Sequence, residues 1–263
     1  GAQHALLHIV QAMLTVLHGP LHIGSGRQLL RDYDYAVRNG RTWRIDEDAL
    51  FDEMQGDDEA INEQLMRVPA AELLQPADYR PESRLFRYVV RGAPRSQEKG
   101  AVVAEQIKDA YDRPYLPGSS LKGAFRTALL SHALAQKSGA LDLDRLNTNR
   151  KWAAQPLERA LLGRDPNHDL LRALHVADSD PLDPNRVLSI NNVQVLVGGK
   201  VGSPIEVEAL QPDVQIRSHV KVDLSLFSSQ AEPQLHLGDR RAWLEDVMAI
   251  CRERAAPMLE AER

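Results

Sequence analysis

The chain has 263 residues, and 43% of them are hydrophobic, so it can bury a core in one large domain or two small ones. An aromatic content of 5% argues against a broad base-stacking platform, and the single cysteine, Cys251, excludes a disulfide framework. No run of eighteen apolar residues and no signal peptide is apparent. We therefore expect a cytoplasmic protein that makes no membrane contact.

The net charge of −5 is unfavourable for nucleic-acid binding, but the acid is concentrated in one segment. Nine acidic residues and no Lys or Arg lie between Asp46 and Glu63. Removing those nine negative charges leaves +4 on the other residues. The rest of the chain can therefore present a basic surface.

The first predicted strand, Leu6–Val16, leads into a glycine-rich loop. There the segment Gly24-Ser25-Gly26 follows His22 and precedes Arg27. Glycines allow backbone N–H groups to approach an anion closely. Because glycine-rich turns are common, this loop alone is a weak indication of a phosphate site.

The clearest local signal in the sequence is a β-hairpin from Tyr33 to Ile45. Asn39-Gly40 suits the two positive-φ positions of a type I′ turn. The residues that follow carry apolar side chains at helical spacing and an acidic face, which predicts a mainly helical insertion at about 46–80. Strands are then predicted at 85–90 and 101–107 from their β-branched and aromatic residues.

The stretch LPGSSLKGAFRTALL, at 116–130, combines a turn with a helix start. Pro117-Gly118 predicts the turn, and Ser119-Ser120 can cap the helix by accepting hydrogen bonds from its first N–H groups. Lys122 and Arg126 are four residues apart and share one helix face. A helix start with free N–H groups, hydroxyls and cations is suited to phosphate.

Two other interpretations of this stretch bear on its function. The helix can be merely capped, with Lys122 and Arg126 solvated. A nucleotide-hydrolysing P-loop is excluded, because the spacing from Gly118 to Gly123 is wrong and no Ser or Thr follows the lysine.

Short helices are predicted at 156–162 and 169–174, followed by three aspartates among prolines. Asp178, Asp180 and Asp183 do not follow the spacing of a calcium-binding loop. We therefore interpret them as turn caps and predict no metal site.

The last predicted strands lie at 187–197, 204–210 and 214–224. The third alternates cleanly, so that one side is apolar and the other carries Arg217, His219 and Lys221. Such a basic stripe can follow a phosphate backbone, or it can be an ordinary solvent-exposed face. An amphipathic helix at about 239–258 completes the predicted elements.

The two glycine-containing segments, in this order and about a hundred residues apart, resemble the RAMP superfamily of CRISPR-associated proteins. The family of the fifth Csm subunit of type III-A effector complexes is the most similar, over about residues 10–225. Further stretches support the likeness: DYAV from Asp34, WRID from Trp43, LHVADS from Leu174, PIEVEAL from Pro204, and the strand through Val222. The resemblance implies an α+β fold with a ferredoxin-like or RRM-like core, as a single RAMP-type domain over 1–263.

The resemblance also implies a function: a non-catalytic subunit that binds crRNA near its 3′ end and caps the backbone filament of the complex. It implies crRNA and other Csm subunits as partners, above all the backbone RAMP paralogue, with target RNA as a further candidate. No cofactor is implied. The residues assigned to RNA binding, from the resemblance and from the residue chemistry together, are His22, Gly24, Ser25, Gly26, Arg27, Gly118, Ser119, Ser120, Lys122, Arg126, Arg217, His219 and Lys221.

Three alternatives stay open. A backbone-type subunit could cleave target RNA with a metal held by Asp32 or Asp34. A crRNA-processing endonuclease could use His22 as general base. The third alternative is an unrelated α+β binding protein. Family members are usually longer and end with another glycine-rich segment, so this sequence is either a short variant or lacks part of the natural chain.

Overall fold

In a computed structural model, the structure describes residues 8–54, 67–136, 149, 152–197 and 200–261. Its contacts divide the chain into two compact units. The helix-rich unit comprises Gly1–Leu14, Leu116–Ser179 and Arg217–Arg263, and the sheet unit comprises Thr15–Tyr115 and Asp180–Ile216. The single RAMP-type domain over 1–263 stays a prediction.

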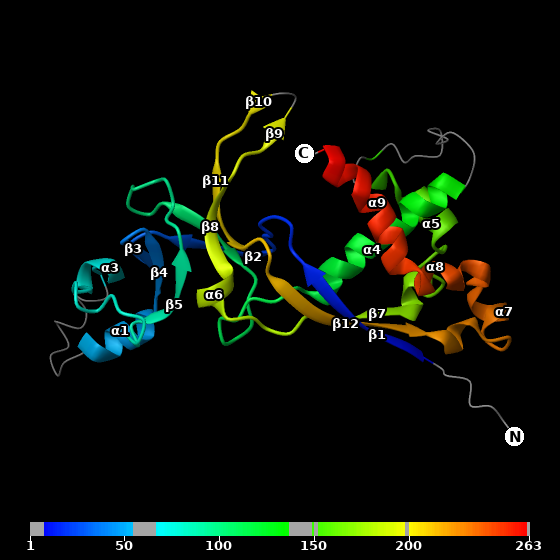
Figure 1. The fold of residues 1–263 in the computed structure, drawn as a ribbon, viewed down its shortest axis with the longest axis horizontal. Coiled ribbons are helices and arrows are strands. Elements are labelled where there is room, and N and C mark those ends of the chain that lie inside the picture. Colours follow the sequence, from blue (N-terminus) through cyan, green and yellow to red (C-terminus); the bar gives the residue numbers. More distant parts are fainter. Residues whose placement is uncertain (1–7, 55–66, 137–148, 150–151, 198–199, 262–263) are drawn as a thin grey trace, which may run out of the picture. The chain divides into compact units, whose positions relative to one another are not determined.

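The sheet unit is built on one seven-stranded sheet (Figure 1). Two neighbouring pairs, β6 with β11 and β5 with β8, are parallel, and the other pairs are antiparallel. A small hairpin of β9 (Leu196–Val197) and β10 (Lys200–Val201) lies beyond β8 and β11. In spatial order the seven strands are β2 (Gly24–Leu30), β6 (Val102–Gln106), β11 (Ile205–Leu210), β8 (Leu188–Val193), β5 (Phe86–Arg91), β4 (Arg41–Ile45) and β3 (Tyr35–Arg38).

The predicted β-hairpin is confirmed. Its strands β3 and β4 pair antiparallel, with Arg38 opposite Arg41. Asn39 and Gly40 have φ values of 52° and 68°, as a type I′ turn requires. The strands predicted at 85–90, 101–107, 187–197 and 204–210 are also present, as β5, β6, β8 with β9, and β11.

Helices lie where the acidic insertion is predicted. They are α1 (Glu47–Met54) and α3 (Ala70–Leu73), while residues 55–66, including the predicted helix positions Ile61 and Leu65, lie outside the described residues. Leu50 of α1 is buried in a cluster with Ile45, Leu74 and Leu85. A third short helix, α6 (Pro184–Val187), begins after Asp183, whose carboxylate accepts a hydrogen bond from the N–H of Asn185.

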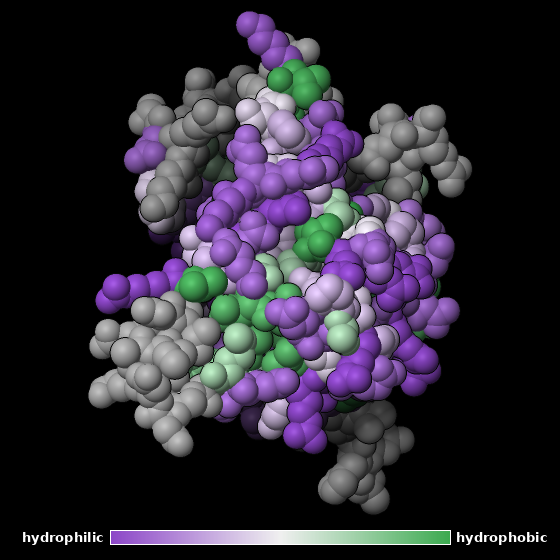
Figure 2. Space-filling model, turned by 90° about the vertical axis from the view of Figure 1, so that its left-hand side faces the viewer, coloured by the Kyte–Doolittle hydropathy of each residue, from purple (hydrophilic) through white to green (hydrophobic). Residues whose placement is uncertain are grey.

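The face of the sheet unit near α1 and α3 is hollowed and partly apolar. Figure 2 views this side and shows apolar atoms gathered within a mainly hydrophilic surface. A cavity of about 570 Å³ there is lined by apolar side chains, and every ionisable residue of its lining apart from Tyr33 is a carboxylate. The lining residues are Tyr33, Asp34, Glu47, Asp48, Leu50, Phe51, Asp52, Met54, Val68, Ala70 and Leu73. An acidic hollow of this kind repels phosphate.

The helix-rich unit combines a three-stranded sheet with helices (Figure 1). The strand order is β1 (His8–Val16), β12 (Gln215–Asp223) and β7 (Leu174–Val176). The first two strands continue across the boundary between the units. The helices of the unit are α4 (Gly118–Gln136), α5 (Gln155–Leu161), η3 (Leu170–Ala173), η4 (Leu224–Phe227), α7 (Glu232–Leu235), η5 (Gly238–Arg240), α8 (Arg241–Glu245) and α9 (Val247–Ala261).

One face of this sheet packs against α4 and α9 to form the core of the helix-rich unit. Met13, Val220 and Val222 from the strands meet Phe125 and Leu129 from α4. Each side chain leaves 7% or less of its surface exposed, and burial of this kind contributes about 1.5–3 kcal/mol per large apolar residue. The core therefore fixes α4 against β12, the two elements that carry most of the predicted RNA contacts.

The helix predicted at about 239–258 consists of three pieces, η5, α8 and α9, with Asp246 between the last two. Cys251 is half-buried against the core, and burial raises the pKa of its thiol. Among the described helices, none is long and apolar enough to cross a membrane. The predicted α+β class is confirmed.

Candidate nucleic-acid interface

The prediction of a free glycine loop at 24–26 is wrong. Gly24, Ser25 and Gly26 begin strand β2, which pairs antiparallel with β6. The register shifts between Gly24 and Gln28, so the segment forms a bulge at the edge of the sheet. Gly26 has a φ of +87°, a conformation that strongly favours glycine. The sheet partner lies about eighty residues further along the chain, which local sequence patterns cannot show.

The polar side chains of this bulge have partners within the sheet unit. The Ser25 hydroxyl donates to Glu105 Oε2 at 2.9 Å and accepts from the N–H of Arg27 at 3.1 Å. The Arg27 guanidinium donates to Asp34 Oδ1 at 2.9 Å. An anion approaching the bulge would therefore meet carboxylates beside each predicted donor.

His22 is half-buried and anchored to the backbone. Its Nδ1 lies 2.6 Å from the carbonyl oxygen of Glu208, so this nitrogen carries a proton and donates it. A Cβ on Gly24 would lie 3.2 Å from His22 Nε2, and glycine at position 24 therefore gives the imidazole room. Sequence and structure agree that these two residues are neighbours.

Beneath His22 lies a buried charged network. The Glu208 side chain is 1% exposed, and it accepts from Lys108 Nζ at 2.6 Å and from the Tyr88 hydroxyl at 2.9 Å. Burial, followed by the charge of Glu208, raises the pKa of Tyr88. Because each buried charge has an opposite partner, the network is internally compensated.

The two aspartates considered for metal-assisted cleavage are held by partners within the sheet unit. Asp34 accepts from the N–H of Leu30 at 2.7 Å, besides its bond to Arg27, and lies 3.6 Å from Arg44. Asp32 has a φ of 69°, and its carboxylate lies 3.8 Å from Arg31. Across the described residues, no group of three His, Cys, Asp or Glu side chains is arranged to hold a metal.

The start of α4 is capped by a residue distant in sequence. The N–H of Gly118 donates to Asp178 Oδ1 at 2.7 Å. A Cβ on Gly118 would overlap the carbonyl oxygen of Val176, so only glycine allows this close approach to the segment after β7. Asp178 is predicted to cap a turn but caps this helix instead, and the prediction that Ser119-Ser120 caps the helix is wrong. Both serines lie within the helix and are exposed.

This capping weakens the helix start as a phosphate site. The carboxylate of Asp178 already satisfies one N–H group and the positive end of the helix dipole. The N–H groups of Ser120 and Leu121 donate to the carbonyl of Pro117. Ser119 and Ser120 are exposed, so this helix start still offers their hydroxyls to an RNA phosphate.

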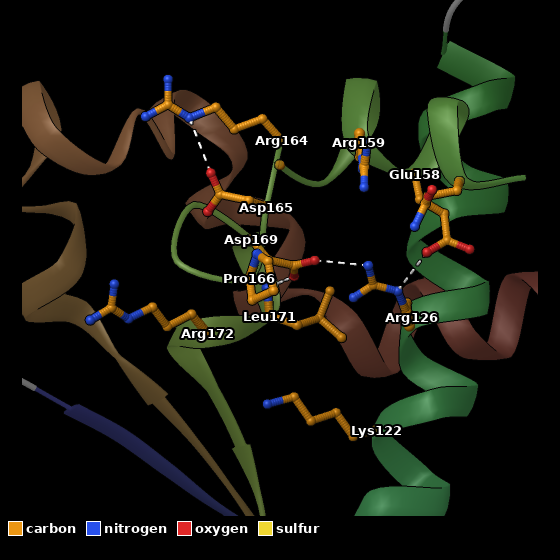
Figure 3. Close-up of a pocket in the computed structure, with 12 residues that line it drawn as sticks. Lys122, Arg126, Glu158, Arg159, Arg164, Asp165, Pro166, Asp169, Leu171 and Arg172 are labelled. Atoms are coloured by element: carbon orange, nitrogen blue, oxygen red, sulfur yellow. Dashed lines mark hydrogen bonds and ion pairs between the residues drawn. The ribbon is translucent and has the colours of Figure 1, made fainter. Parts of the chain in front are cut away.

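Lys122 and Arg126 line one cavity of about 510 Å³, but their charges are used differently (Figure 3). Arg126 donates to Asp169 Oδ2 at 2.8 Å and to Glu158 Oε2 at 3.2 Å. Lys122 has no carboxylate within 4 Å among the described residues. Burial lowers the pKa of its half-buried amine, Asp169 opposes this effect, and Arg126 adds to it.

The basic stripe on β12 is present as the alternation predicts. Ile216, Val220 and Val222 face the core, whereas Arg217 and His219 are exposed and Lys221 is half-buried. In the part of the chain that the structure describes, no carboxylate lies within 4 Å of these three side chains. The stripe therefore places two cations, Arg217 and Lys221, and the imidazole of His219 on one face of one strand, with no ion-pair partner among the described residues.

Three arginines of the cavity were not singled out from the sequence. Arg159 lies on α5, Arg164 follows it, and Arg172 lies on η3. All three are exposed. Their irregular spacing in the sequence gives no periodic signal, and only the fold of the segment between α5 and η3 brings them to Lys122.

The fold and these cationic surfaces define a class of protein. The family model for the RAMP superfamily matches residues 16–242, and the chain belongs to that superfamily. The predicted resemblance to the fifth Csm subunit is confirmed, because curated proteins and a solved structure named Csm5 are similar to this chain. Curated relatives are the CRISPR system Cms protein Csm5 of Mycobacterium tuberculosis, 29% identical over 133 residues, and that of Streptococcus thermophilus, 33% identical over 90 residues.

These alignments cover 45% and 32% of this chain and 35% and 23% of the relatives, so the matches span about a third or less of the relatives' length. Solved structures match over more of the chain. Csm5 of T. onnurineus has a TM-score of 0.70 and 25% identity over 95% of this chain and 79% of that one. A chain in a Csm–crRNA–target RNA ternary complex of a type III-A system shares the fold, with a TM-score of 0.61 and 24% identity over 91% of this chain and 72% of that one.

Proposed function

We propose that this chain is a crRNA-binding subunit of a type III-A CRISPR effector complex. The superfamily assignment and the similarity to proteins named Csm5 support this role. The shared fold with a chain from a complex of Csm, crRNA and target RNA is consistent with it. Under this proposal crRNA, target RNA and other Csm subunits are its partners, and the cytoplasm is its location.

The observation that carries the proposal is the basic face of β12. Arg217, His219 and Lys221 alternate along an extended strand, so the cations of Arg217 and Lys221 lie with the His219 imidazole on the same side of the sheet. A single-stranded RNA lying along this face would place its phosphates next to those cations. Binding of this kind depends on the sugar-phosphate backbone and gives little base specificity.

Lys122 and the hydroxyls of Ser119 and Ser120 extend the proposed contact within the same unit. The amine of Lys122 lacks a carboxylate partner within 4 Å among the described residues, so an RNA phosphate would supply the missing counter-charge. The bulge residues Gly24, Ser25, Gly26 and Arg27, with His22, are proposed as a weaker contact, because their donors already face Glu105 and Asp34.

We further propose that the subunit binds RNA without cleaving it and caps the backbone filament near the crRNA 3′ end. The Asp34 carboxylate accepts from Leu30 and Arg27 and lies 3.6 Å from the Arg44 guanidinium, which ties it to the fold. The Nδ1 of His22 is committed to the Glu208 carbonyl. A target-cleavage assay comparing Asp32→Ala and Asp34→Ala with the parent complex should show equal cleavage rates, and the isolated protein should leave repeat RNA uncut in the absence of metal. A target cut that either aspartate variant abolishes, or a repeat-RNA cut that His22→Ala abolishes, would overturn this assignment.

The test of RNA binding uses the double variant Arg217→Ala/Lys221→Ala. We expect its affinity for a fluorescent single-stranded RNA to fall on the order of tenfold at low salt. The slope of log affinity against log salt should become less steep by about 0.7 for each phosphate that the variant no longer neutralises. The matched control is Arg80→Ala/Arg84→Ala, which removes two exposed cations from the sheet unit. Equal affinities for both double variants and the parent would refute the proposed interface.

A further inference from the structure

The cavity beside Lys122 lies wholly within the helix-rich unit. It is walled by α4, α5, η3 and the segment between the last two (Figure 3). Its volume of about 510 Å³ is in the range of sites for small ligands. The residues that line it include five cations and three carboxylates, and the lining holds no aromatic side chain. Whether the cavity attracts or repels an anion therefore depends on how these charges are paired.

The three carboxylates are already matched by internal partners. Glu158 and Asp169 accept from the two sides of the Arg126 guanidinium, as the dashed lines of Figure 3 show. Asp165 accepts from His168 Nδ1 at 2.7 Å and lies 3.3 Å from Arg164 Nε. Hydrogen bonding from His168, the largest cause, lowers the pKa of Asp165. These carboxylates consequently offer little free negative charge to the cavity.

Three cations are left over after this pairing. Lys122, Arg159 and Arg172 have no carboxylate within 4 Å among the described residues, and Arg172 donates only to the carbonyl oxygen of Asn167, at 2.9 Å. In Figure 3 the Lys122 side chain points from α4 toward the segment that carries Leu171 and Arg172. The burial that lowers the pKa of Lys122 would be offset by an anion placed next to its amine.

The segment that shapes one wall is held in a fixed conformation. Gly163 has a φ of +146°, and a Cβ there would overlap the carbonyl of His168. Asp169 begins η3 by accepting from the N–H of Leu171 at 2.8 Å while it also binds Arg126. The wall is therefore preorganised, which reduces the entropy lost when a ligand binds.

We propose that this cavity binds one nucleotide unit of RNA by its phosphate group, through Lys122, Arg159 and Arg172. The assignment rests on the proposed function and extends the contact beyond the start of α4. Arg126 is then a positioning residue, which holds α4 against α5 and η3 through Glu158 and Asp169 and does not itself contact RNA. The absence of aromatic side chains from the lining predicts that the base of that nucleotide is not read by stacking.

The experiment compares Arg159→Ala/Arg172→Ala in the full chain with the parent and with Arg252→Ala, which removes an exposed arginine of α9 outside the cavity. Two probes are used, a fluorescent single-stranded oligouridylate and uridine 3′-monophosphate as its competitor. We expect the double variant to bind the oligomer about three- to tenfold more weakly, with a salt slope less steep by about 0.7 to 1.4, and Arg252→Ala to match the parent.

The two probes separate the sources of the phosphate. If uridine 3′-monophosphate competes with the oligomer for the parent but not for the double variant, the cavity captures a terminal or free nucleotide. A loss seen only with the oligomer supports a phosphate inside the chain. If the double variant binds both probes like the parent, the proposal is overturned. If it then also loses binding to a hexaglutamate peptide that the parent retains, the cavity is assigned to an acidic protein partner instead.

Failure of the proposed function gives a different pattern. If Arg159→Ala/Arg172→Ala leaves RNA affinity unchanged while Arg217→Ala/Lys221→Ala lowers it, only the cavity assignment is wrong. If both double variants bind RNA like the parent, the RNA-binding function itself falls. Circular dichroism of each variant excludes unfolding as the cause of a loss.

Discussion

The two units contain cavities of similar size and opposite character. The cavity of the sheet unit, about 570 Å³, is lined by apolar side chains and four carboxylates. The cavity of the helix-rich unit, about 510 Å³, has five cations against three carboxylates that are already paired. Because the chain as a whole carries a net charge of −5, the difference shows that its charge is unevenly distributed, and under the proposed function this distribution decides where RNA binds.

The units also differ in what their polar groups do. In the sheet unit Arg27, Lys108 and Arg44 are each bound to carboxylates. In the helix-rich unit Lys122 and Arg217 have no carboxylate within 4 Å among the described residues. We infer that Arg27, Lys108 and Arg44 mainly stabilise the sheet unit, whereas Lys122 and Arg217 are available to bind the proposed RNA ligand.

The largest expected effect concerns the buried ion pair of the sheet unit. Lys108→Met removes the partner of Glu208, whose side chain is 1% exposed, and leaves a buried carboxylate without its counter-charge. We expect the free energy of unfolding to fall by about 3–5 kcal/mol, measured by urea denaturation. Lys99→Met is the control, because its pair with Glu72 is exposed and its removal should leave the free energy of unfolding nearly unchanged. Equal costs for both variants would contradict a structural role for the buried pair.

The second effect contrasts two glycines of α4. Gly118→Ala places a Cβ against the backbone carbonyl of Val176, so we expect a loss of roughly 3 kcal/mol or more in the free energy of unfolding. At Gly123 no atom lies near the position that a Cβ would take. Gly123→Ala should therefore stabilise the protein by about 0.5–1 kcal/mol, through helix propensity alone. Thermal unfolding of both variants checks the sign of each change.

The third effect is a loss of stability at alkaline pH. It concerns the sheet unit, because all six tyrosines belong to that unit. Burial raises the pKa of Tyr35 from 10.0 to about 12, and its hydroxyl donates to the carbonyl of Ala101. This contribution to stability is fully present below pH 10 and is lost as the pH rises toward 12, by roughly 3 kcal/mol for a shift of two units. Tyr35→Phe should flatten the alkaline limb of a stability-versus-pH curve, and an unchanged limb would contradict it.

The smallest effect concerns the glycine bulge. Arg27→Ala removes a guanidinium that is already paired with Asp34, so we expect RNA affinity to fall less than about threefold, compared with the larger loss at β12. Fluorescence anisotropy with single-stranded RNA measures both in parallel. If Arg27→Ala lowered RNA affinity more than Arg217→Ala/Lys221→Ala does, the assignment of roles to the two units would be reversed.

Local signals were sufficient for much of the fold. Asn39-Gly40 predicted its turn because both residues adopt positive φ, and the alternation through Ile216 and Val220 predicted β12 and its exposed face. The predictions failed where a partner is distant in sequence. Asp178 caps a helix that begins sixty residues earlier, and β6 turns the segment Gly24-Ser25-Gly26 into a strand.

The same limit applied to the site. Lys122 and Arg126 were expected to act alike because they share a helix face, but Asp169, forty-three residues beyond Arg126, neutralises only one of them. Arg159 and Arg172 carry no local signal, since only packing of α5 and η3 brings them to the cavity. A sequence pattern can indicate cations, but which of them stay unpaired is decided by the fold.

The most direct test of the account is photochemical crosslinking of crRNA to the protein, with the crosslinked peptides identified by mass spectrometry. The account predicts that crosslinks concentrate on the peptides of the helix-rich unit at 116–126, 155–172 and 217–223, with few at 22–31. Crosslinks confined to the sheet unit, with none on those three peptides, would contradict the claim that the unpaired cations of the helix-rich unit hold the RNA.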